Sequence, residues 1–525
     1  MTPQRPGALE LIDLVVEPGS FVSWDTPPDR AGISSEYAAE LDAATERSGV
    51  DEAVLTGRGL IDGLPVAVVV GEFRFLGGSI GAATAARITA AVRRATAERL
   101  PLVAAPASGG TRMQEGTPAF VEMVTISRAI VDHKAAALPY LVYLRHPTTG
   151  GVFASWGSLG HVTVAEPGAL VGFLGPKVHE ALNGEPFPAG VQLAENLVDK
   201  GVIDAVVPSE ELATVAARVL RLLPPHRRDD AAATPETPET PETPETPETP
   251  ATPATPATPA TPEIVSVSSK NVGRDAHDPG GEGRAWPAPT ESRQVWASVE
   301  ITRSPRRPGV RELLRYAADE VLPLSGTGEG QHDAGLMLAL ASFGGDPCVL
   351  VGQDRRNQAK QSMGPAALRS ARRGMRLAQE LGLPLVSVID TPGADLSVTA
   401  EEGALAGEIA RCIADMTQLT VPSVALLLGQ GCGGGALAML PARRVVVAEH
   451  GWLSPLPPEG ASVIVHGTPD HAPEMTLRQR ISAPQLVEAG IAHRIVPETV
   501  PADQDPRAFC RAMAEALTIE LATQS

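Results

Sequence analysis

Glycines give the clearest sign of chemistry in this sequence, and they are densest in the stretch LLLGQGCGGGALAML (426–440). An apolar run leads into these glycines and another follows them, which is typical of a buried strand that turns into a helix. Gly429, Gly431 and Gly434 have the spacing G-x-G-x-x-G, and Glu449 follows at a suitable remove for a ribose hydroxyl. Taken alone, the pattern indicates dinucleotide binding, but it is short and weakly specific.

The chain contains two copies of one pattern. Residues 79–103 align without a gap on residues 362–386, and each stretch predicts a helix that runs into a buried strand. Residues 197–208 likewise repeat as residues 486–497. A repeat of roughly half the chain length predicts two domains of one fold and excludes a solenoid.

Each copy carries two glycine turns, and each turn follows an apolar strand. An offset of 283 residues places Gly110 on Gly393, and it places Gly150-Gly151 on Gly433-Gly434. N–H groups that a tight turn leaves free bind anions, and two such turns aimed at one oxygen form an oxyanion hole. Glycine is required where a side chain would block the approach. Because the first copy lacks G-x-G-x-x-G, the paired turns replace the dinucleotide reading as the shared feature.

Candidate acids, bases and nucleophiles are less persuasive. Ser108 precedes two glycines but lacks the G-x-S-x-G elbow. Glu115 and Glu459 are predicted to be solvated or to cap helices, and Cys432 to be a small buried residue. Four histidines in the first half share no metal-ligand spacing: His133, His146, His161 and His179. The sequence therefore favours a stabilised enolate whose proton is removed by a group that the protein does not carry.

Composition limits the partners and the compartment. The net charge of −19 argues against nucleic acid. We find no apolar run of 18 residues and no signal peptide near the start, so we predict a cytoplasmic protein without membrane contact. The four cysteines are scattered, and no C-x-x-C pair occurs. Neither a disulfide framework nor a zinc ribbon is expected, and we predict no metal.

A low-complexity segment separates the two copies. Thr-Pro units recur at a period of three from Thr234 to Pro262, which favours an extended polyproline rod that cannot bury a core. We therefore predict a first domain over residues 1–224, a linker over 225–293 and a second domain over 294–525.

Motifs in the two halves resemble a known family. The first half resembles the beta subunit of bacterial acetyl-CoA carboxylase carboxyltransferase in EFRFLGGSIG (72–81), PASGGTRMQEG (106–116) and HPTTGGVFAS (146–155). The second half resembles the alpha subunit in SVIDTPGADLSVTAEEGALAGEIAR (387–411), GQGCGGGALAML (429–440) and PPEGASVIV (457–465). The resemblance implies an α/β fold, with two crotonase-like domains (the ββα superhelix of the ClpP/crotonase class) and a fused beta-alpha chain.

The resemblance also implies the reaction and its site. A carboxyl group would move from carboxybiotin to the α-carbon of acetyl-CoA or propionyl-CoA, and the ureido anion left after CO2 release would remove the α-proton. The thioester enolate would be held in the first half by Gly109, Gly110, Gly150 and Gly151. The biotin ureido oxygen would be held in the second half by Gly393, Gly434, Gly435 and Ala436. The offset pairs Gly433-Gly434 with the first copy whereas the family motif favours Gly434-Gly435, which leaves a one-residue ambiguity.

The resemblance also implies partner proteins. Biotin would arrive on a separate biotin carboxyl carrier protein, loaded by a separate biotin carboxylase, and a homo-oligomer is expected. Four basic residues are candidates for contact with CoA phosphates: Arg74, Arg112, Arg145 and Lys177. The chain departs from the family in lacking the four-cysteine zinc ribbon and in having Gly326-Thr327-Gly328 where Gly-Asp-Arg is usual. A biotin-dependent malonyl-thioester decarboxylase and a non-catalytic scaffold remain as alternatives.

Overall fold

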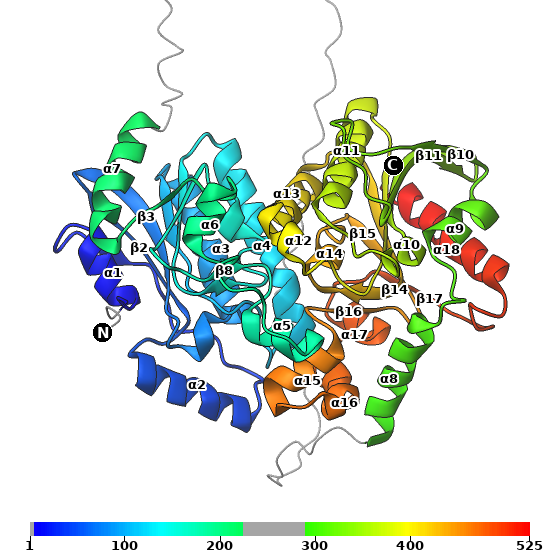
Figure 1. Ribbon diagram of the computed structural model, residues 1–525, viewed down its shortest axis with the longest axis horizontal. Coiled ribbons are helices and arrows are strands. Elements are labelled where there is room, and N and C mark those ends of the chain that lie inside the picture. Colours follow the sequence, from blue (N-terminus) through cyan, green and yellow to red (C-terminus); the bar gives the residue numbers. More distant parts are fainter. Residues whose placement is uncertain (1–4, 224–288, 525) are drawn as a thin grey trace, which may run out of the picture. The chain divides into compact units, whose positions relative to one another are not determined.

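The computed structural model describes residues 5–223 and 289–524. The predicted linker, 225–293, lies largely outside the described residues, and helix α8 begins within that range at Pro289. The two halves of the chain pack together as one unit. The two halves lie side by side and contact each other (Figure 1).

The first half is built on a seven-stranded sheet with the strand order β1-β2-β3-β4-β5-β7-β9. Its strands are β1 (Val22–Ser23), β2 (Val54–Ile61), β3 (Leu64–Gly71), β4 (Leu102–Ala105), β5 (Tyr140–Leu144), β7 (Val162–Ala165) and β9 (Ala205–Val206), with β6 (Thr148–Thr149) and β8 (Val171–Gly172) paired separately. Its helices are α1 (Ala8–Val15), α2 (Ser35–Ser48), α3 (Ala82–Ala97), α4 (Gly116–Ala135), α5 (Pro176–Asn183), α6 (Ala194–Asp199) and α7 (Leu212–Leu222).

The second half repeats this sheet. The order is β10-β11-β12-β13-β14-β15-β17, with β16 added beside β14. Its strands are β10 (Glu320–Leu324), β11 (Leu336–Phe343), β12 (Asp346–Gln353), β13 (Leu385–Thr391), β14 (Ser423–Cys432), β15 (Arg444–Ala448), β16 (Trp452–Ser454) and β17 (Arg494–Val496). Its helices are α8 (Pro289–Arg303), α9 (Val310–Ala317), α10 (Arg355–Gln358), α11 (Pro365–Leu381), α12 (Val398–Glu402), α13 (Leu405–Gln418), α14 (Gly433–Leu437), α15 (Pro458–His466), α16 (Ala472–Arg478), α17 (Ala483–Glu488) and α18 (Pro506–Ala522).

In both sheets the first three strands are antiparallel and the following strands are parallel. The aligned stretches 79–103 and 362–386 form the equivalent pairs α3 with β4 and α11 with β13, so the predicted helix and strand are found in each copy. Two domains of one α/β fold, each crotonase-like, are thus confirmed.

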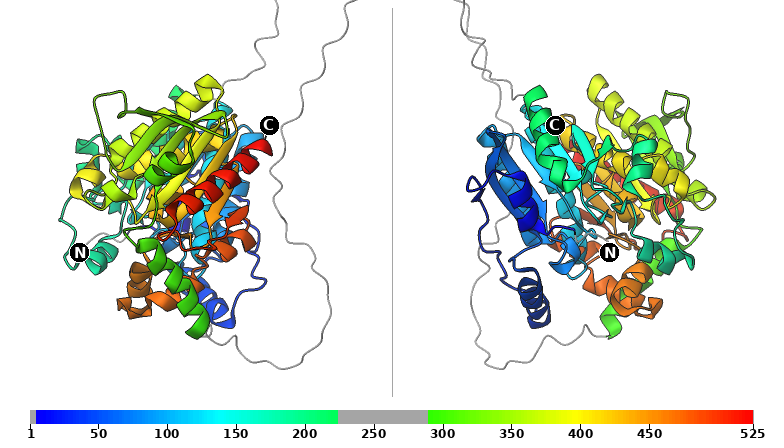
Figure 2. Two further views of the ribbon diagram at one scale, coloured as in Figure 1. Left: turned by 90° about the vertical axis from the view of Figure 1, so that its right-hand side faces the viewer. Right: turned by 60° about the vertical axis from the view of Figure 1, so that its left-hand side comes forward.

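Each sheet is covered by helices on both faces. Side chains alternate along β3, so Val66 and Val68 face α1 and α7 while Ala67 and Val69 face α3 and α4 (Figures 1 and 2). In the second half, α9 and α18 cover one face and α11 and α13 the other. This arrangement leaves the carboxyl ends of the parallel strands to carry the glycine turns.

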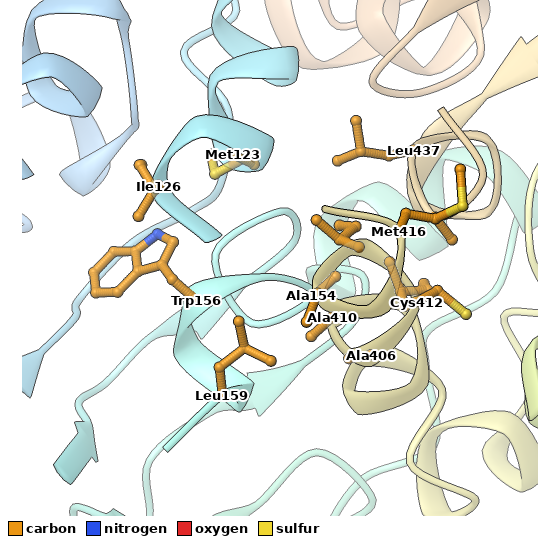
Figure 3. Packing of buried hydrophobic residues seen from close by; sticks show 14 of the residues in the cluster. Met123, Ile126, Ala154, Trp156, Leu159, Ala406, Ala410, Cys412, Met416 and Leu437 are labelled. Atoms are coloured by element: carbon orange, nitrogen blue, oxygen red, sulfur yellow. The ribbon is translucent and has the colours of Figure 1, made fainter. Parts of the chain in front are cut away.

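An apolar seam joins the two halves. Helix α4 of the first half packs against α13 of the second, where small residues such as Ala406 and Ala410, one turn apart, allow close approach. Met123 and Trp156 of the first half lie in the same cluster as Met416 and Leu437 of the second (Figure 3). The glycine turns of the two halves are consequently fixed by a shared core.

Among the described residues, no helix has the length and apolarity that a membrane crossing would require.

The cysteine thiols should be unreactive in the folded protein. Cys348, Cys412, Cys432 and Cys510 are all buried. Burial raises the pKa of Cys348, Cys432 and Cys510 to about 12, and that of Cys412 also rises. We expect an aromatic disulfide reagent to label none of them rapidly in the native state and all of them after unfolding in guanidinium. A native-state thiol that reacted as fast as an unfolded one would contradict this burial.

Candidate active site

A cavity of about 430 Å³ lies where the two halves meet. Its wall includes glycines from both copies: Gly109, Gly110, Gly150, Gly151 and Gly434. Apolar residues complete it, including Phe173, Leu174 and Val178 of the first half and Leu437, Val463 and Ile464 of the second. Five of the eight predicted site residues are thus brought to one space, whose side chains are mostly apolar.

The backbone confirms the offset of 283 residues and removes the one-residue ambiguity. Gly150 and Gly433 both have a left-handed φ, 65° and 62°, and each opens a short helical turn. Gly110 and Gly393 also both have positive φ, 112° and 138°. Residues with a Cβ rarely adopt these angles, which explains glycine at all four positions. Gly151 is therefore the counterpart of Gly434.

The turns at Gly110 and Gly393 also share a hydrogen bond to a hydroxyl two residues earlier in the chain. The N–H of Gly110 donates to the Ser108 hydroxyl at 3.0 Å, and the N–H of Gly393 donates to the Thr391 hydroxyl at 3.1 Å. Gly109 N–H donates to the Gly77 carbonyl at 2.9 Å. Since these N–H groups already have acceptors, we assign them a shaping role and not the donor role predicted from the sequence. Ser108 is likewise a turn-forming residue and not a nucleophile.

Free N–H donors follow the left-handed glycines Gly150 and Gly433 in the two copies. Within the described chain, the N–H groups of residues 151–153 have no hydrogen-bond acceptor, and those of Gly434 and Gly435 lie at the second and third positions of α14. They form the first turn of a helical segment, where i−4 carbonyls are not available. Gly151 and Gly434 both line the cavity, whereas Gly435 and Ala436 lie behind Gly434. The two copies therefore present equivalent unpaired N–H groups to the same space.

Gly434 also permits a close contact between the halves. A Cβ built there would lie 2.8 Å from the Phe173 ring and 2.9 Å from the Ile409 side chain. At Gly151 a Cβ would be in ordinary contact, 3.5 Å from Met123 and Thr111. The second-half turn is consequently the more tightly covered of the two.

The remaining glycines of the opening stretch serve packing. A Cβ on Gly429 would lie 3.1 Å from an Asp390 carboxylate oxygen, and one on Gly431 would lie 2.7 Å from the Trp452 carbonyl. Glu449 accepts a hydrogen bond from the Glu498 N–H. Both glycines lie within strand β14, where neighbouring residues leave no room for a side chain. The dinucleotide interpretation is therefore wrong for this loop.

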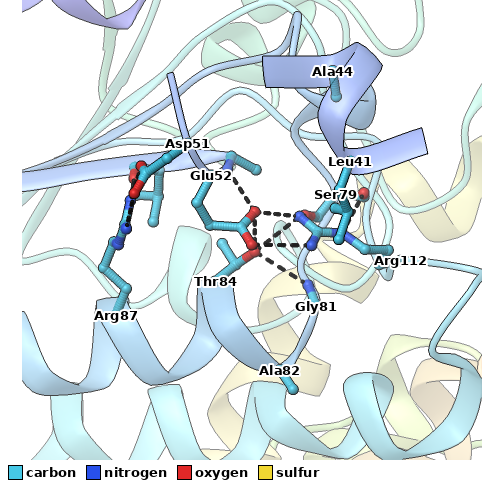
Figure 4. Close-up of polar contacts among 12 residues, drawn as sticks. Leu41, Ala44, Asp51, Glu52, Ser79, Gly81, Ala82, Thr84, Arg87 and Arg112 are labelled. Carbon is cyan, nitrogen blue, oxygen red and sulfur yellow. Dashed lines mark hydrogen bonds and ion pairs between the residues drawn. The ribbon is translucent and has the colours of Figure 1, made fainter. Parts of the chain in front are cut away.

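Two of the predicted phosphate ligands are internal. Arg112 is 1% exposed and forms hydrogen bonds with both carboxylate oxygens of Glu52, with the Ser79 carbonyl and with Thr84 (Figure 4). Burial by itself disfavours both charges, but their pairing raises the pKa of Arg112 and lowers that of Glu52. Arg112 therefore holds the loop before α3 and does not face a ligand.

Arg145 is also buried, and it donates to the Gly71 carbonyl at 2.7 Å and to the Pro6 carbonyl. Arg74 is half-exposed and pairs with Glu72 at 2.9 Å. Lys177 lies in α5, and its side chain lies outside the described part of the structure. Arg74 and Lys177 thus remain the candidates for contact with phosphate.

The acids and histidines weighed from the sequence have structural partners. Glu115 accepts the Ala82 N–H at 2.6 Å at the start of α3, and Glu459 pairs with Arg303 at 2.6 Å. His133 contacts Thr96 and the Pro139 carbonyl, and burial lowers its pKa to about 4. These groups are committed to the fold, as the sequence indicated.

Sequence reasoning missed Glu401, which crosses from the second half to the cavity wall. Its carboxylate accepts the Phe173 N–H at 2.8 Å and the Gln192 side-chain N–H at 2.6 Å. Burial raises its pKa, and the hydrogen bonds from Gln192 and Phe173 only partly oppose this. No local motif identifies Glu401, because its partners lie more than two hundred positions away.

Replacing Glu401 by glutamine should flatten the pH dependence of stability. A raised pKa means that the folded chain holds this proton more tightly, so the free energy of unfolding falls as pH rises from 4.5 through the raised value. The variant lacks this loss, and its stability relative to the parent should therefore increase with pH in denaturant titrations.

Glu402→Gln is the matched control. The Lys200 ammonium, 2.9 Å away, lowers the pKa of the partly exposed Glu402, so the parent chain loses this contribution to stability only as pH falls below 4.5. The pH dependence of the difference between Glu402→Gln and the parent should therefore have the opposite sign. A pH-independent difference between Glu401→Gln and the parent would contradict the assignment.

The duplicated crotonase-like fold, with paired glycine turns at one cavity, defines the class of the protein, and comparisons with known proteins give the family. A model described as "Carboxyl transferase domain" matches residues 5–266, and one described as "Acetyl co-enzyme A carboxylase carboxyltransferase-like" matches residues 290–525. The chain belongs to the carboxyltransferase family of biotin-dependent acyl-CoA carboxylases.

Named relatives cover nearly the whole chain. A "Probable biotin-dependent acyl-coenzyme A carboxylase beta3 subunit" of Mycobacterium tuberculosis is 51% identical over 98% of this chain and 93% of that protein. "Acetyl-coenzyme A carboxylase carboxyl transferase subunits beta/alpha" of Salinispora arenicola is 35% identical over 97% of this chain and 85% of that protein. A solved transcarboxylase 12S structure is 19% identical, with a TM-score of 0.38, over 98% and 90% of the two chains.

Proposed function

We propose that this chain transfers a carboxyl group from carboxybiotin, carried on a separate protein, to the α-carbon of an acyl-CoA, with acetyl-CoA as the first substrate to test. The single observation that carries this proposal is the cavity at which unpaired N–H groups of equivalent turns, at Gly151 and Gly434, come from opposite halves. Two donors from separate halves suit two reactants that each carry an oxygen acceptor.

The first half takes the acyl-CoA. Its free N–H groups, beginning at Gly151, stabilise the negative charge on the thioester oxygen when the α-proton leaves. The cavity is lined largely by apolar side chains and is shielded by the seam, so this charge is stabilised in a medium of low dielectric constant. Gly109, Gly110 and Gly150 shape the wall around the same oxygen.

The second half takes the biotin. The N–H groups of Gly434 and Gly435 fit a ureido oxygen, because they are first-turn donors of α14 beside a largely apolar pocket. Carboxybiotin, when bound, supplies the carboxyl group and a ureido nitrogen that accepts the α-proton. Gly393 positions the backbone beside Cys432 and supports the turn. On this division, residues 1–224 form the acyl-CoA half and residues 294–525 the biotin half.

The partners are a biotin carboxyl carrier protein and a biotin carboxylase. The relative from Salinispora arenicola carries the name of acetyl-CoA carboxylase, whereas the more similar relative from Mycobacterium tuberculosis carries the general acyl-CoA name. Acetyl-CoA and propionyl-CoA should both be assayed, since the apolar side chains of Phe173, Val463 and Ile464 line the cavity.

The reverse reaction tests the proposal without the partners. Malonyl-CoA incubated with the chain and free biotin should release acetyl-CoA at a rate that depends on biotin. A malonyl thioester that is decarboxylated faster than acetyl-CoA is carboxylated in a reconstituted system would favour the biotin-dependent decarboxylase alternative, and binding of acyl-CoA without turnover in either direction would favour the scaffold. Either result, with a known carboxyltransferase active in parallel, would overturn the proposal.

A further inference from the structure

A group of potential metal ligands lies at the end of the helix that forms one wall of the cavity. His466 is the last residue of α15, His471 closes the following 3-10 turn, and Glu474 lies in the first turn of α16. One ligand atom from each lies within 4.8 Å of the others. None of these residues enters the carboxyl-transfer site.

The side chains of this group already adopt a shared arrangement. The two imidazole rings stack with centroids 4.3 Å apart and planes 27° from parallel. Nδ1 of His471 lies 3.1 Å from a Glu474 carboxylate oxygen, which leaves its Nε2 as the free ring nitrogen. Nε2 of His466 is buried and has no hydrogen-bond partner in the described structure. A buried polar atom without a partner requires an explanation, and a bound ion supplies one.

The backbone holds this group in place. Gly467 ends α15 in a left-handed conformation, with φ of 74°. The Ser462 hydroxyl donates to the Thr468 carbonyl at 2.5 Å and accepts the His471 N–H at 3.1 Å. These contacts fix the distance between His466 and His471 without using either imidazole. The backbone that carries the ligand set is thus positioned before any ion binds.

We propose that His466, His471 and Glu474 bind a divalent transition-metal ion, with Zn²⁺ as the first ion to test. Two imidazoles and a carboxylate are a ligand set that Zn²⁺ uses, and the H-x4-H separation lies within the usual range. Bonds of about 2.0–2.2 Å place two ligands of one ion at most about 4.4 Å apart. The present ligand atoms lie within 4.8 Å of one another, so the partly exposed His471 and Glu474 must rotate inward. The site contains no cysteine, which is why a search for cysteine spacing gave no metal.

Binding would affect the cavity through α15. This helix supplies Val463 and Ile464 to the cavity wall, and the ion would tie its carboxyl end to α16. Ile464 and Val465 are exposed on the same helix. The ion is thereby a structural restraint on the wall and takes no part in carboxyl transfer.

The test uses the full-length, untagged chain after removal of metal with a chelator. Isothermal titration with ZnCl2 should show one ion per chain for the parent and for His332→Gln, an exposed histidine outside the group. His466→Gln and His471→Gln should each weaken binding by at least the about 10–100-fold that loss of an outer hydrogen-bond partner costs a metal site. Equal affinities in all these chains would overturn the proposal.

Cobalt gives a second readout. Co²⁺ added to the metal-free parent should produce visible absorption bands of a low-symmetry nitrogen and oxygen site, and His471→Gln should abolish them. Because His471 is exposed, this variant tests the site even if His466→Gln fails to fold. Identical spectra for the parent and His471→Gln would likewise overturn the proposal.

Discussion

Gly434→Val should lower biotin-dependent turnover by about 10²–10³-fold while acyl-CoA binds as before, because removing access to one oxyanion donor costs that much in enzymes that use such donors. A Cβ at this position already lies 2.8 Å from the Phe173 ring, so valine methyl groups would occupy the space in front of the N–H groups of Gly434 and Gly435. The φ of Gly434 is not left-handed, and the change therefore imposes no backbone strain. Initial rates with varied biotin and calorimetry with acyl-CoA measure the two effects.

Gly151→Val is the matched variant, at the equivalent position of the first copy. Its Cβ meets only ordinary contacts with Met123 and Thr111, and its φ is not left-handed either. We expect it to weaken acyl-CoA binding and to leave the apparent KM for biotin unchanged. If both variants reduced acyl-CoA affinity equally, the assignment of one reactant to each half would be wrong.

Arg112→Leu should reduce the free energy of unfolding by about 3–5 kcal/mol, because it leaves the buried Glu52 carboxylate without its counter-ion. Glu52 is 2% exposed and keeps only the Ala53 N–H and the Thr84 hydroxyl as donors (Figure 4). The loop at Ser79 also loses its hydrogen bond from the guanidinium. Urea denaturation measures the effect.

Two further chains distinguish a lost ion pair from general damage. Arg58→Leu removes an exposed pair with Glu98, 3.6 Å apart, and should cost less than about 1 kcal/mol. Combining Arg112→Leu with Glu52→Leu should cost less than Arg112→Leu alone, because no uncompensated charge stays buried. A double variant as unstable as the sum of its single changes would contradict this account of Arg112.

The fold could be predicted because its signal is repeated. The stretches 79–103 and 362–386 carry the same hydrophobic periodicity, and the structure gives each the same helix and strand in sheets of the same order. The left-handed glycines were predictable for the same reason, since Gly150 and Gly433 stay glycine in both copies. The two copies within one chain therefore support the same prediction twice, as two related sequences would.

The charged residues could not be placed in this way. Arg112 and Arg145 have the charge that CoA phosphates attract, but burial depends on partners far away in sequence, such as Glu52 for Arg112 and Gly71 for Arg145. The sequence also does not show which N–H groups are free. Those of Gly110 and Gly393 donate to the Ser108 and Thr391 hydroxyls, which only the structure reveals. The site was therefore predicted at the level of its turns and not of its donors.

A crystal structure of the chain with an acyl-CoA and biotin bound tests the central claim most directly, namely that equivalent turns of the two halves serve different reactants at one cavity. We predict the thioester oxygen within about 2.7–3.1 Å of the Gly151 N–H and the ureido oxygen at a similar distance from the Gly434 N–H. Both ligands bound at the turns of a single half, or either one bound away from this cavity, would contradict it.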